Sequence, residues 1–253
     1  FLSEPGIKTV LQKVEATHMQ DQGKEMKKVD AELYFVIDEK HNSVELTEKG
    51  IQLMASYTGD GSLFVLPNIG LEIARIDKIC FAAHENNVPV FIDAEETWIQ
   101  DTIDRITRDM MRKYNTEKAL IYNTLQMYRH DRLIFLQQEI EHARKEGFHY
   151  GVKLVRGAYM EKERERASKM GYPSPIQPDK TSCDSDFNSA LKLILSNIDI
   201  MALCSGSHNE ESALILATLM AENGIHNNDE RIYFAQLLGM SDHISYNLSN
   251  LGY

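Results

Sequence analysis

The chain has 253 residues, of which 43% are hydrophobic and 26% charged, values typical of a globular protein rather than an extended disordered chain. It has 38 acidic and 27 basic residues, and the resulting net charge of −11 argues against nucleic acid and tight docking on anionic lipid as partners. We see neither an apolar run that could span a bilayer nor a secretory signal pattern. The three cysteines lack CxxC spacing. We therefore expect a reducing, cytoplasmic location, at most peripheral at the inner face of a membrane.

Residues 1–72 differ in pattern from the rest and predict an α+β segment of separate origin. We expect a helix over residues 1–22, a strand over 33–38 and a short helix capped by Thr47. The strings YFVIDEKHNSVELTEKGIQLM and FVLPNIG resemble a segment of the SecA-type preprotein-translocase motor ATPase. Neither the phosphate-binding loop nor the acidic magnesium motif of that ATPase is present, so ATP hydrolysis does not carry over.

Residues 73–253 alternate between helical and strand patterns, which predicts an α/β fold with a parallel sheet. No GxGxxG follows any strand, so a Rossmann-type nucleotide site is not expected. A polar residue ends each strand, and in a barrel these positions converge on one mouth. The barrel, a partial or distorted (βα)8 type, is therefore favoured over an open sheet. The predicted strands cover residues 88–93, 119–128, 150–155, 200–207 and 231–237, and the predicted helices 73–86, 98–114, 133–146, 161–169, 187–196 and 210–223.

The stretch YGVKLVRGAY, residues 150–159, organises the second part of the chain. A buried strand ends at Arg156, and the small residues Gly157 and Ala158 let another group approach the backbone closely. Tyr159 adds a ring with a polar tip. The stretch alone fits two interpretations equally well: a ligand site at a strand end, or an ordinary buried strand followed by a cationic helix N-terminus.

Five motifs occur in order along the second part of the chain: FIDAEETWIQ, NTLQMYRHDR, VKLVRGAYMEKERERASKMGYPSPI, SHNEES and YFAQLLGMSDHISYNL. Together they resemble the proline dehydrogenase family, whose members have a distorted (βα)8 barrel and bind FAD. The resemblance runs from about Arg75 to Tyr253. It implies oxidation of L-proline to Δ1-pyrroline-5-carboxylate, with a hydride passing to flavin N5 and electrons passing on to a membrane quinone.

The resemblance assigns roles to particular residues. Asp93 is expected to be a buried catalytic acid near the proline amine, although a helix-capping aspartate is the alternative. Lys153 stands where many members have arginine and is expected to stabilise reduced flavin as a point charge. Tyr159 and Leu237 are the expected substrate contacts, although a core leucine explains Leu237 equally well. No metal site is expected. The expected FAD contacts are Ala94, Gln126, Val155, Arg156, Gly157, Ser207 and His208.

Parts of the family pattern are absent from this sequence. The first barrel strand and the C-terminal strands and helix, which supply a substrate-contacting lysine and an arginine pair, are not found, so impaired activity is expected. LYFVID, residues 33–38, is the only candidate for a replacement strand. We expect a composite chain joined near residues 70–75. Two other hypotheses stay open: a non-catalytic fragment related to the translocase, and a barrel aldolase that uses Lys153 as a Schiff-base amine.

Overall fold

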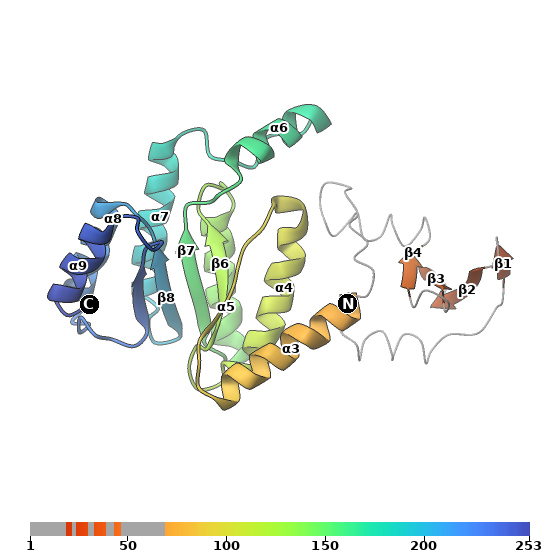
Figure 1. The fold of residues 1–253 in the computed structure, drawn as a ribbon, viewed down its shortest axis with the longest axis horizontal. Helices are drawn as coiled ribbons and strands as arrows, with labels where there is room; N and C mark the ends of the chain where they lie inside the picture. Colours follow the sequence, from red (N-terminus) through yellow and green to blue (C-terminus); the bar gives the residue numbers. More distant parts are fainter. Residues whose placement is uncertain (1–18, 22–23, 30–32, 39–42, 47–68) are drawn as a thin grey trace. The chain divides into compact units, whose positions relative to one another are not determined.

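The structure, a computed structural model, describes residues 19–21, 24–29, 33–38, 43–46 and 69–253, with side chains from residue 73 onward (Figure 1). Two compact units divide the chain, residues 1–81 and residues 82–253. Among the described residues, no helix combines the length and the apolar character needed to cross a bilayer.

The first unit contains a four-stranded antiparallel sheet with the strand order β1-β2-β3-β4. Its strands are β1 (Met19–Asp21), β2 (Lys24–Val29), β3 (Leu33–Asp38) and β4 (Ser43–Leu46). The prediction of a strand over residues 33–38 is confirmed. This strand was the only candidate for a replacement barrel strand, but both of its edges are taken by antiparallel pairing with β2 and β4. The predicted helix over residues 1–22 is wrong at β1, and its remainder lies outside the described residues, as does the predicted helix at Thr47.

The second unit is built on a five-stranded parallel sheet whose strands follow the order of the sequence. They are β5 (Val90–Ile92), β6 (Ile121–Gln126), β7 (Tyr150–Val155), β8 (Met201–Gly206) and β9 (Ile232–Ala235). Sequential parallel pairing with a helix after each strand is the arrangement of a (βα) barrel. The sheet curls into a half-barrel, so the predicted α/β fold with a partial barrel is confirmed at that level (Figure 1).

Each of the six predicted helices is present, although α3 and α7 begin earlier than predicted, and one further helix follows near the C-terminus. Gly147 ends α5 in the left-handed conformation, with φ of 76°, as expected for a helix-stopping glycine. Helix α7 starts earlier than predicted because Asp179 caps it by accepting from the Ser182 N–H. Helix α9 was not predicted, and β9 ends at Ala235, slightly before the predicted strand end near Gln236 and Leu237. The helices are α3 (Ile69–Glu85), α4 (Thr97–Tyr114), α5 (Arg132–Glu146), α6 (Met160–Met170), α7 (Lys180–Leu195), α8 (Glu210–Glu222) and α9 (Asp242–Asn250).

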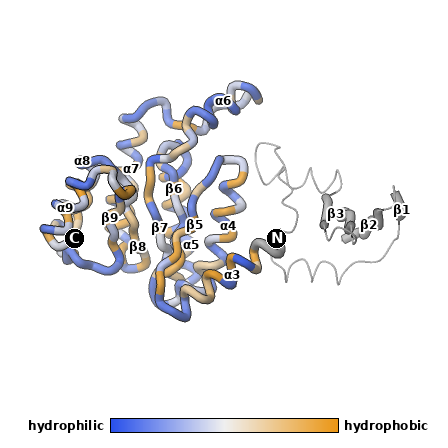
Figure 2. Tube along the Cα trace, in the orientation of Figure 1, coloured by the Kyte–Doolittle hydropathy of each residue, from blue (hydrophilic) through white to orange (hydrophobic). Residues whose placement is uncertain are grey.

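The core of the second unit lies along the central strands. Every residue of β6 is buried, and Val152, Leu154 and Leu203 of β7 and β8 have no exposed surface. Figure 2 shows hydrophobic residues concentrated along β7 and β8. Strands covered on both faces need apolar residues in succession rather than in alternation, which explains the apolar runs in the sequence.

Gly151 of β7 allows an aromatic ring to pack inside the curl of the sheet. It pairs in register with Tyr122 of β6, which in turn pairs with Phe91 of β5. A Cβ on Gly151 would lie 2.8 Å from the Tyr122 ring and 2.6 Å from the Ile121 carbonyl oxygen, so only glycine fits. The Tyr122 and Phe91 rings lie 5.0 Å apart, between centroids, and form an aromatic layer below the strand ends.

Candidate active site

The predicted site residues gather at the carboxyl edge of the parallel sheet. Parallel strands place their C-terminal ends on one edge, so residues distant in sequence meet there. Asp93 and Ala94 follow β5, and Gln126 ends β6. The remaining ones, apart from Tyr159 and Leu237, lie in or directly after β7 and β8: Lys153, Val155, Arg156, Gly157, Ser207 and His208.

Asp93 and Lys153 form an ion pair, in which Lys153 Nζ donates to Asp93 Oδ1. The Lys153 side chain is 22% exposed, and its ammonium lies 5.8 Å from the centre of the Phe91 ring. The expectation of a buried Asp93 is wrong, because its side chain is 71% exposed. Strand β5 is an edge strand of the described sheet, so Asp93 has a neighbouring strand on one side only. This leaves Asp93 Oδ2 accessible from solvent.

Gln126 joins two loops at the carboxyl edge. Its Nε2 donates to the Glu95 carbonyl oxygen at 2.8 Å, and its Oε1 accepts from the Ala158 N–H at 3.2 Å. The side chain is buried at 4% exposure, so these contacts fix its orientation. A glutamine amide has two N–H donors and two acceptor lone pairs, and Gln126 therefore keeps one of each for another partner. Ala94 is half-buried in the same loop, beside Glu95.

Arg156 connects the end of β7 with three other elements. Its Nε donates to Asp184 at 2.6 Å, and its two terminal nitrogens donate to Ser207 Oγ at 2.7 Å and Ser212 Oγ at 2.9 Å. The guanidinium also stacks on the Phe187 ring at 4.4 Å. Three of its five N–H donors are engaged in this way, which leaves two. The alternative of a cationic helix N-terminus is wrong for Arg156, because it contacts α7 and α8 and lies outside α6.

Gly157 has φ of 127°, a conformation that favours glycine. A Cβ at this position would lie 2.5 Å from the ring of Tyr128. The Tyr128 N–H donates to the Arg156 carbonyl oxygen at 2.7 Å, and the Met127 N–H donates to the Val155 carbonyl oxygen at 2.8 Å. The chain after β7 therefore runs directly against the chain after β6, and the absence of a side chain at Gly157 is what permits this approach.

Tyr159 lies on the Asp93 side of the site. Its hydroxyl donates to Glu95 Oε2 at 2.8 Å, and this hydrogen bond raises the pKa of the Tyr159 hydroxyl. The structure thus groups Tyr159, Gln126, Lys153 and Asp93 around the loop after β5. Glu95, which connects them, was missed in the sequence. Its one signal was its position two residues after the strand-end aspartate.

Ser207, His208 and Leu237 lie on the β8 and β9 side. Ser207 Oγ accepts from Arg156 and from the Asn209 N–H at 3.1 Å, so it belongs to the Arg156 cluster. His208 is exposed. The alternative of a core leucine is wrong for Leu237, which is 67% exposed. Within the described ranges, no group of three or more His, Cys, Asp or Glu side chains could hold a metal ion.

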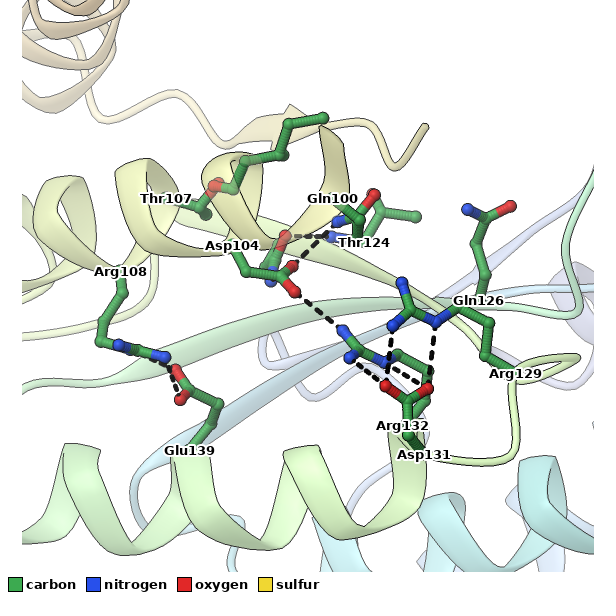
Figure 3. A network of polar contacts seen from close by, with 12 residues as sticks. Gln100, Asp104, Thr107, Arg108, Thr124, Gln126, Arg129, Asp131, Arg132 and Glu139 are labelled. Carbon is green, nitrogen blue, oxygen red and sulfur yellow. Dashed lines mark hydrogen bonds and ion pairs between the residues drawn. The ribbon is translucent and has the colours of Figure 1, made fainter. Parts of the chain in front are cut away.

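A buried polar network extends from this site to helix α5 (Figure 3). The Glu95 N–H donates to Gln100 Oε1 at 2.8 Å, and Gln100 Nε2 donates to Asp104 Oδ1 at 2.8 Å. Asp104 also accepts from Arg132 at 2.7 Å, in an ion pair whose side chains are 3% and 5% exposed. Arg132 and Arg129 both donate to Asp131. The network ties the loop that carries Asp93 to the packed interior.

A curled parallel sheet with polar and charged groups gathered at its carboxyl edge defines a (βα)-barrel protein with an enzyme-like site. The sequence profile of the proline dehydrogenase family matches residues 4–253, and the chain therefore belongs to that family.

Individual relatives agree with this assignment. Human mitochondrial proline dehydrogenase 1 is 40% identical over 184 residues, which cover 72% of this chain and 31% of the relative. A hydroxyproline dehydrogenase of Xenopus laevis is 38% identical over 209 residues, covering 81% of this chain and 44% of the relative. The crystal structure of proline utilization A from Bdellovibrio bacteriovorus matches with a TM-score of 0.67 at 23% identity, covering 72% of this chain and 19% of that one. The chain thus spans less than half the length of these relatives.

The resemblance of residues 1–72 to the translocase motor finds no support in these comparisons. The family match begins at residue 4 and so runs through most of that segment. The separate origin of the segment and the join near residues 70–75 stay predictions. Family membership gives no support to a barrel aldolase with a Schiff base on Lys153.

Proposed function

We propose that this chain carries the FAD-binding, proline-oxidising site of a proline dehydrogenase. L-proline would lose a hydride from the ring carbon next to nitrogen and a proton from nitrogen, which forms the C=N bond of Δ1-pyrroline-5-carboxylate. A membrane quinone is the proposed final electron acceptor. The observation that carries the proposal is the meeting of Asp93, Lys153, Gln126 and Tyr159 at one sheet edge in a member of this family.

The residues at the carboxyl edge fit FAD, a flat and anionic cofactor. Gly157, Ala158 and Gly206 carry little or no side chain, so a ring system can lie close to the backbone. Arg156 keeps two N–H donors for the ribityl chain or phosphates, and Gln126 keeps one donor and one acceptor for the ring. When bound, FAD supplies the hydride acceptor at its N5 position. Val155, Ala94, Ser207 and His208 are the other proposed contacts.

Lys153 and Asp93 are proposed to stabilise two different charges, the negative charge of the reduced flavin and the positive charge of the substrate ammonium. The Lys153 ammonium is proposed to stabilise the negative charge that the flavin gains on reduction. Asp93 Oδ1 accepts from Lys153, and Oδ2 is left to pair with the ammonium of proline. A carboxylate at this point can hold the substrate nitrogen and accept the proton that nitrogen loses as the C=N bond forms. Tyr159 and Leu237 are the proposed contacts to the proline ring, and the support for Leu237 is the family resemblance alone.

The decisive experiment is a visible absorption spectrum of the purified chain with FAD, before and after L-proline is added without oxygen. We expect a bound-flavin band that bleaches with L-proline. Hydroxyproline belongs in the same series, because a relative carries that substrate in its name. Asp93→Asn should retain flavin and bleach at least roughly 100-fold more slowly. Failure to bind FAD, or unchanged bleaching in Asp93→Asn, would overturn the proposal.

A further inference from the structure

Three neighbouring contacts join the loop after β5 to the start of helix α6, and together we name them the clasp. The Tyr159 hydroxyl donates to Glu95 at 2.8 Å. Lys162 forms an ion pair with Glu96, and this hydrogen bond lowers the pKa of Glu96. Glu163 accepts from both the backbone and the side chain of Thr97. The partners are successive on the loop, residues 95–97, and lie within one and a half turns of the start of α6.

Glu163 is the buried member of the clasp. Its carboxylate has no exposed surface, and its two oxygens accept from the Thr97 N–H at 2.7 Å and from Thr97 Oγ1 at 2.8 Å. Thr97 is the first residue of α4, where backbone N–H groups have no partner inside the helix. The residue at the N-cap position, Glu96, makes no side-chain capping bond. Glu163 therefore caps α4 from another helix, and the positive end of the α4 dipole favours its charge.

Helix α6 has few other anchors to the unit. Only Glu163 and Ala167 among its residues are buried. Beyond these, the Arg166 guanidinium stacks on the Trp98 ring at 4.4 Å, next to the same helix start, and Arg164 donates to the carbonyl oxygens of Gln177 and Pro178. A buried carboxylate is costly unless its oxygens accept hydrogen bonds, and Glu163 finds these donors only when α6 lies against Thr97. A change at Glu163 should therefore alter the position of α6.

From this geometry we infer that Glu163 is a positioning residue, which holds the loop bearing Asp93 against the segment bearing Lys153 and Tyr159. It acts through Thr97 and touches neither substrate nor cofactor. The loop before α4 carries Asp93, and the segment before α6 follows the strand that carries Lys153. Glu163 is a buried residue of α6 that contacts the first residue of α4 directly. The expected effect of Glu163 on catalysis rests on the proposed function. Its expected effect on the position of the two segments rests on the contacts alone.

The test compares Glu163→Gln and Glu163→Ala with a matched control, Glu161→Ala. Glu161 is exposed in the same first turn of α6. Glutamine keeps both contacts, because its oxygen can accept from the Thr97 N–H and its amide nitrogen can donate to Thr97 Oγ1. Hydrogen exchange is measured on the full chain without FAD, at the amides of residues 95–99 and of β7. We expect Glu163→Ala to lower the hydrogen-exchange protection factor of the Thr97 amide by roughly tenfold to 100-fold and to leave the protection of the β7 amides unchanged.

A second measurement follows kcat and KM for proline in the FAD-loaded chain. Glu163→Ala should lower kcat/KM by roughly 100-fold, since a small displacement of a reacting group has that effect, and Glu163→Gln should restore most of it. The local exchange result does not depend on flavin, so loss of the proposed function and loss of the clasp are distinguishable. Unchanged exchange at Thr97, equal losses in β7, or no rescue by glutamine would each overturn the inference.

Discussion

Replacing Gly157 by alanine tests the close approach of the two strand ends that shape the site. An alanine Cβ would lie 2.5 Å from the Tyr128 ring, where real Cβ contacts do not occur. The Tyr128 backbone is held on both sides, because its N–H donates to Arg156 at 2.7 Å and its carbonyl accepts from Gln177 at 2.6 Å. The ring is 5% exposed and packs with Ile176 and Cys183, so it cannot turn away freely.

Two costs add in Gly157→Ala. A residue with φ of 127° is strained by about 1–3 kcal/mol unless it is glycine. Overpacking against a buried ring costs about 1–3 kcal/mol more. The free energy of unfolding should therefore fall by about 2–6 kcal/mol. The control is Gly171→Ala, because Gly171 has φ of 76° and nothing within 4 Å of its missing Cβ. It should lose only the backbone cost of about 1–2 kcal/mol.

Urea unfolding followed by the fluorescence of the single tryptophan, Trp98, measures both variants. Equal losses in Gly157→Ala and Gly171→Ala would refute the reasoning, since only Gly157 faces a ring. A double variant sharpens the test. With Tyr128→Leu in the background, Gly157→Ala should cost less by about 1–3 kcal/mol, which is the coupling of two groups in contact.

Three further predictions concern the network and the thiols. Arg132→Met removes the buried ion-pair partner of Asp104 and should cost about 3–5 kcal/mol in urea unfolding, whereas loss of the exposed Arg144 ion pair should change the free energy of unfolding little. Burial raises the pKa of the Asp131 carboxyl, but the hydrogen bonds from its two arginine partners outweigh burial and leave it lowered. The stability that this carboxylate contributes is present above its unfolded pKa of about 3.9 and is lost as pH falls through the folded value, so Asp131→Asn should flatten the decline in acid-unfolding curves. Burial raises the pKa of the Cys204 thiol to about 11, although the positive charge of Lys153 opposes this shift. Cys204 in the native protein should therefore react with a thiol reagent at pH 8 far more slowly than in the urea-unfolded protein.

The parallel sheet was predictable because most of its strands are rich in apolar residues, and its central strands β6, β7 and β8 are almost wholly buried. Strands β5, β8 and β9 read VFI, MALCSG and IYFA, and a polar residue follows directly after each of them, so these strands and their ends were visible in the sequence. Strand β2, with the sequence KEMKKV, carries no such signal. It forms by antiparallel pairing with β1 and β3, and pairing partners are a tertiary property that local propensity does not encode.

The sequence did not indicate which charged residues are buried and hold the site together. The run EKERERASK was predicted as a helix, but nothing in it distinguishes buried Glu163 from exposed Glu161 and Glu165. The same is true of Asp104, which follows a helical pattern whose other acidic residues face solvent. A charged side chain is buried only when a partner element supplies its hydrogen bonds, so its burial is decided by packing.

Glu95 explains how the site can be open to solvent and still be well positioned. Its N–H is held by Gln100, its carbonyl by Gln126 and its carboxylate by Tyr159, so each polar group of one residue is fixed by a different element. The backbone two residues after Asp93 therefore cannot shift without breaking contacts to α4, to β6 and to the start of α6. The Asp93 side chain is exposed, and the loop that carries it is anchored three times. Anchoring of this kind is the preorganisation that charge-pairing sites require.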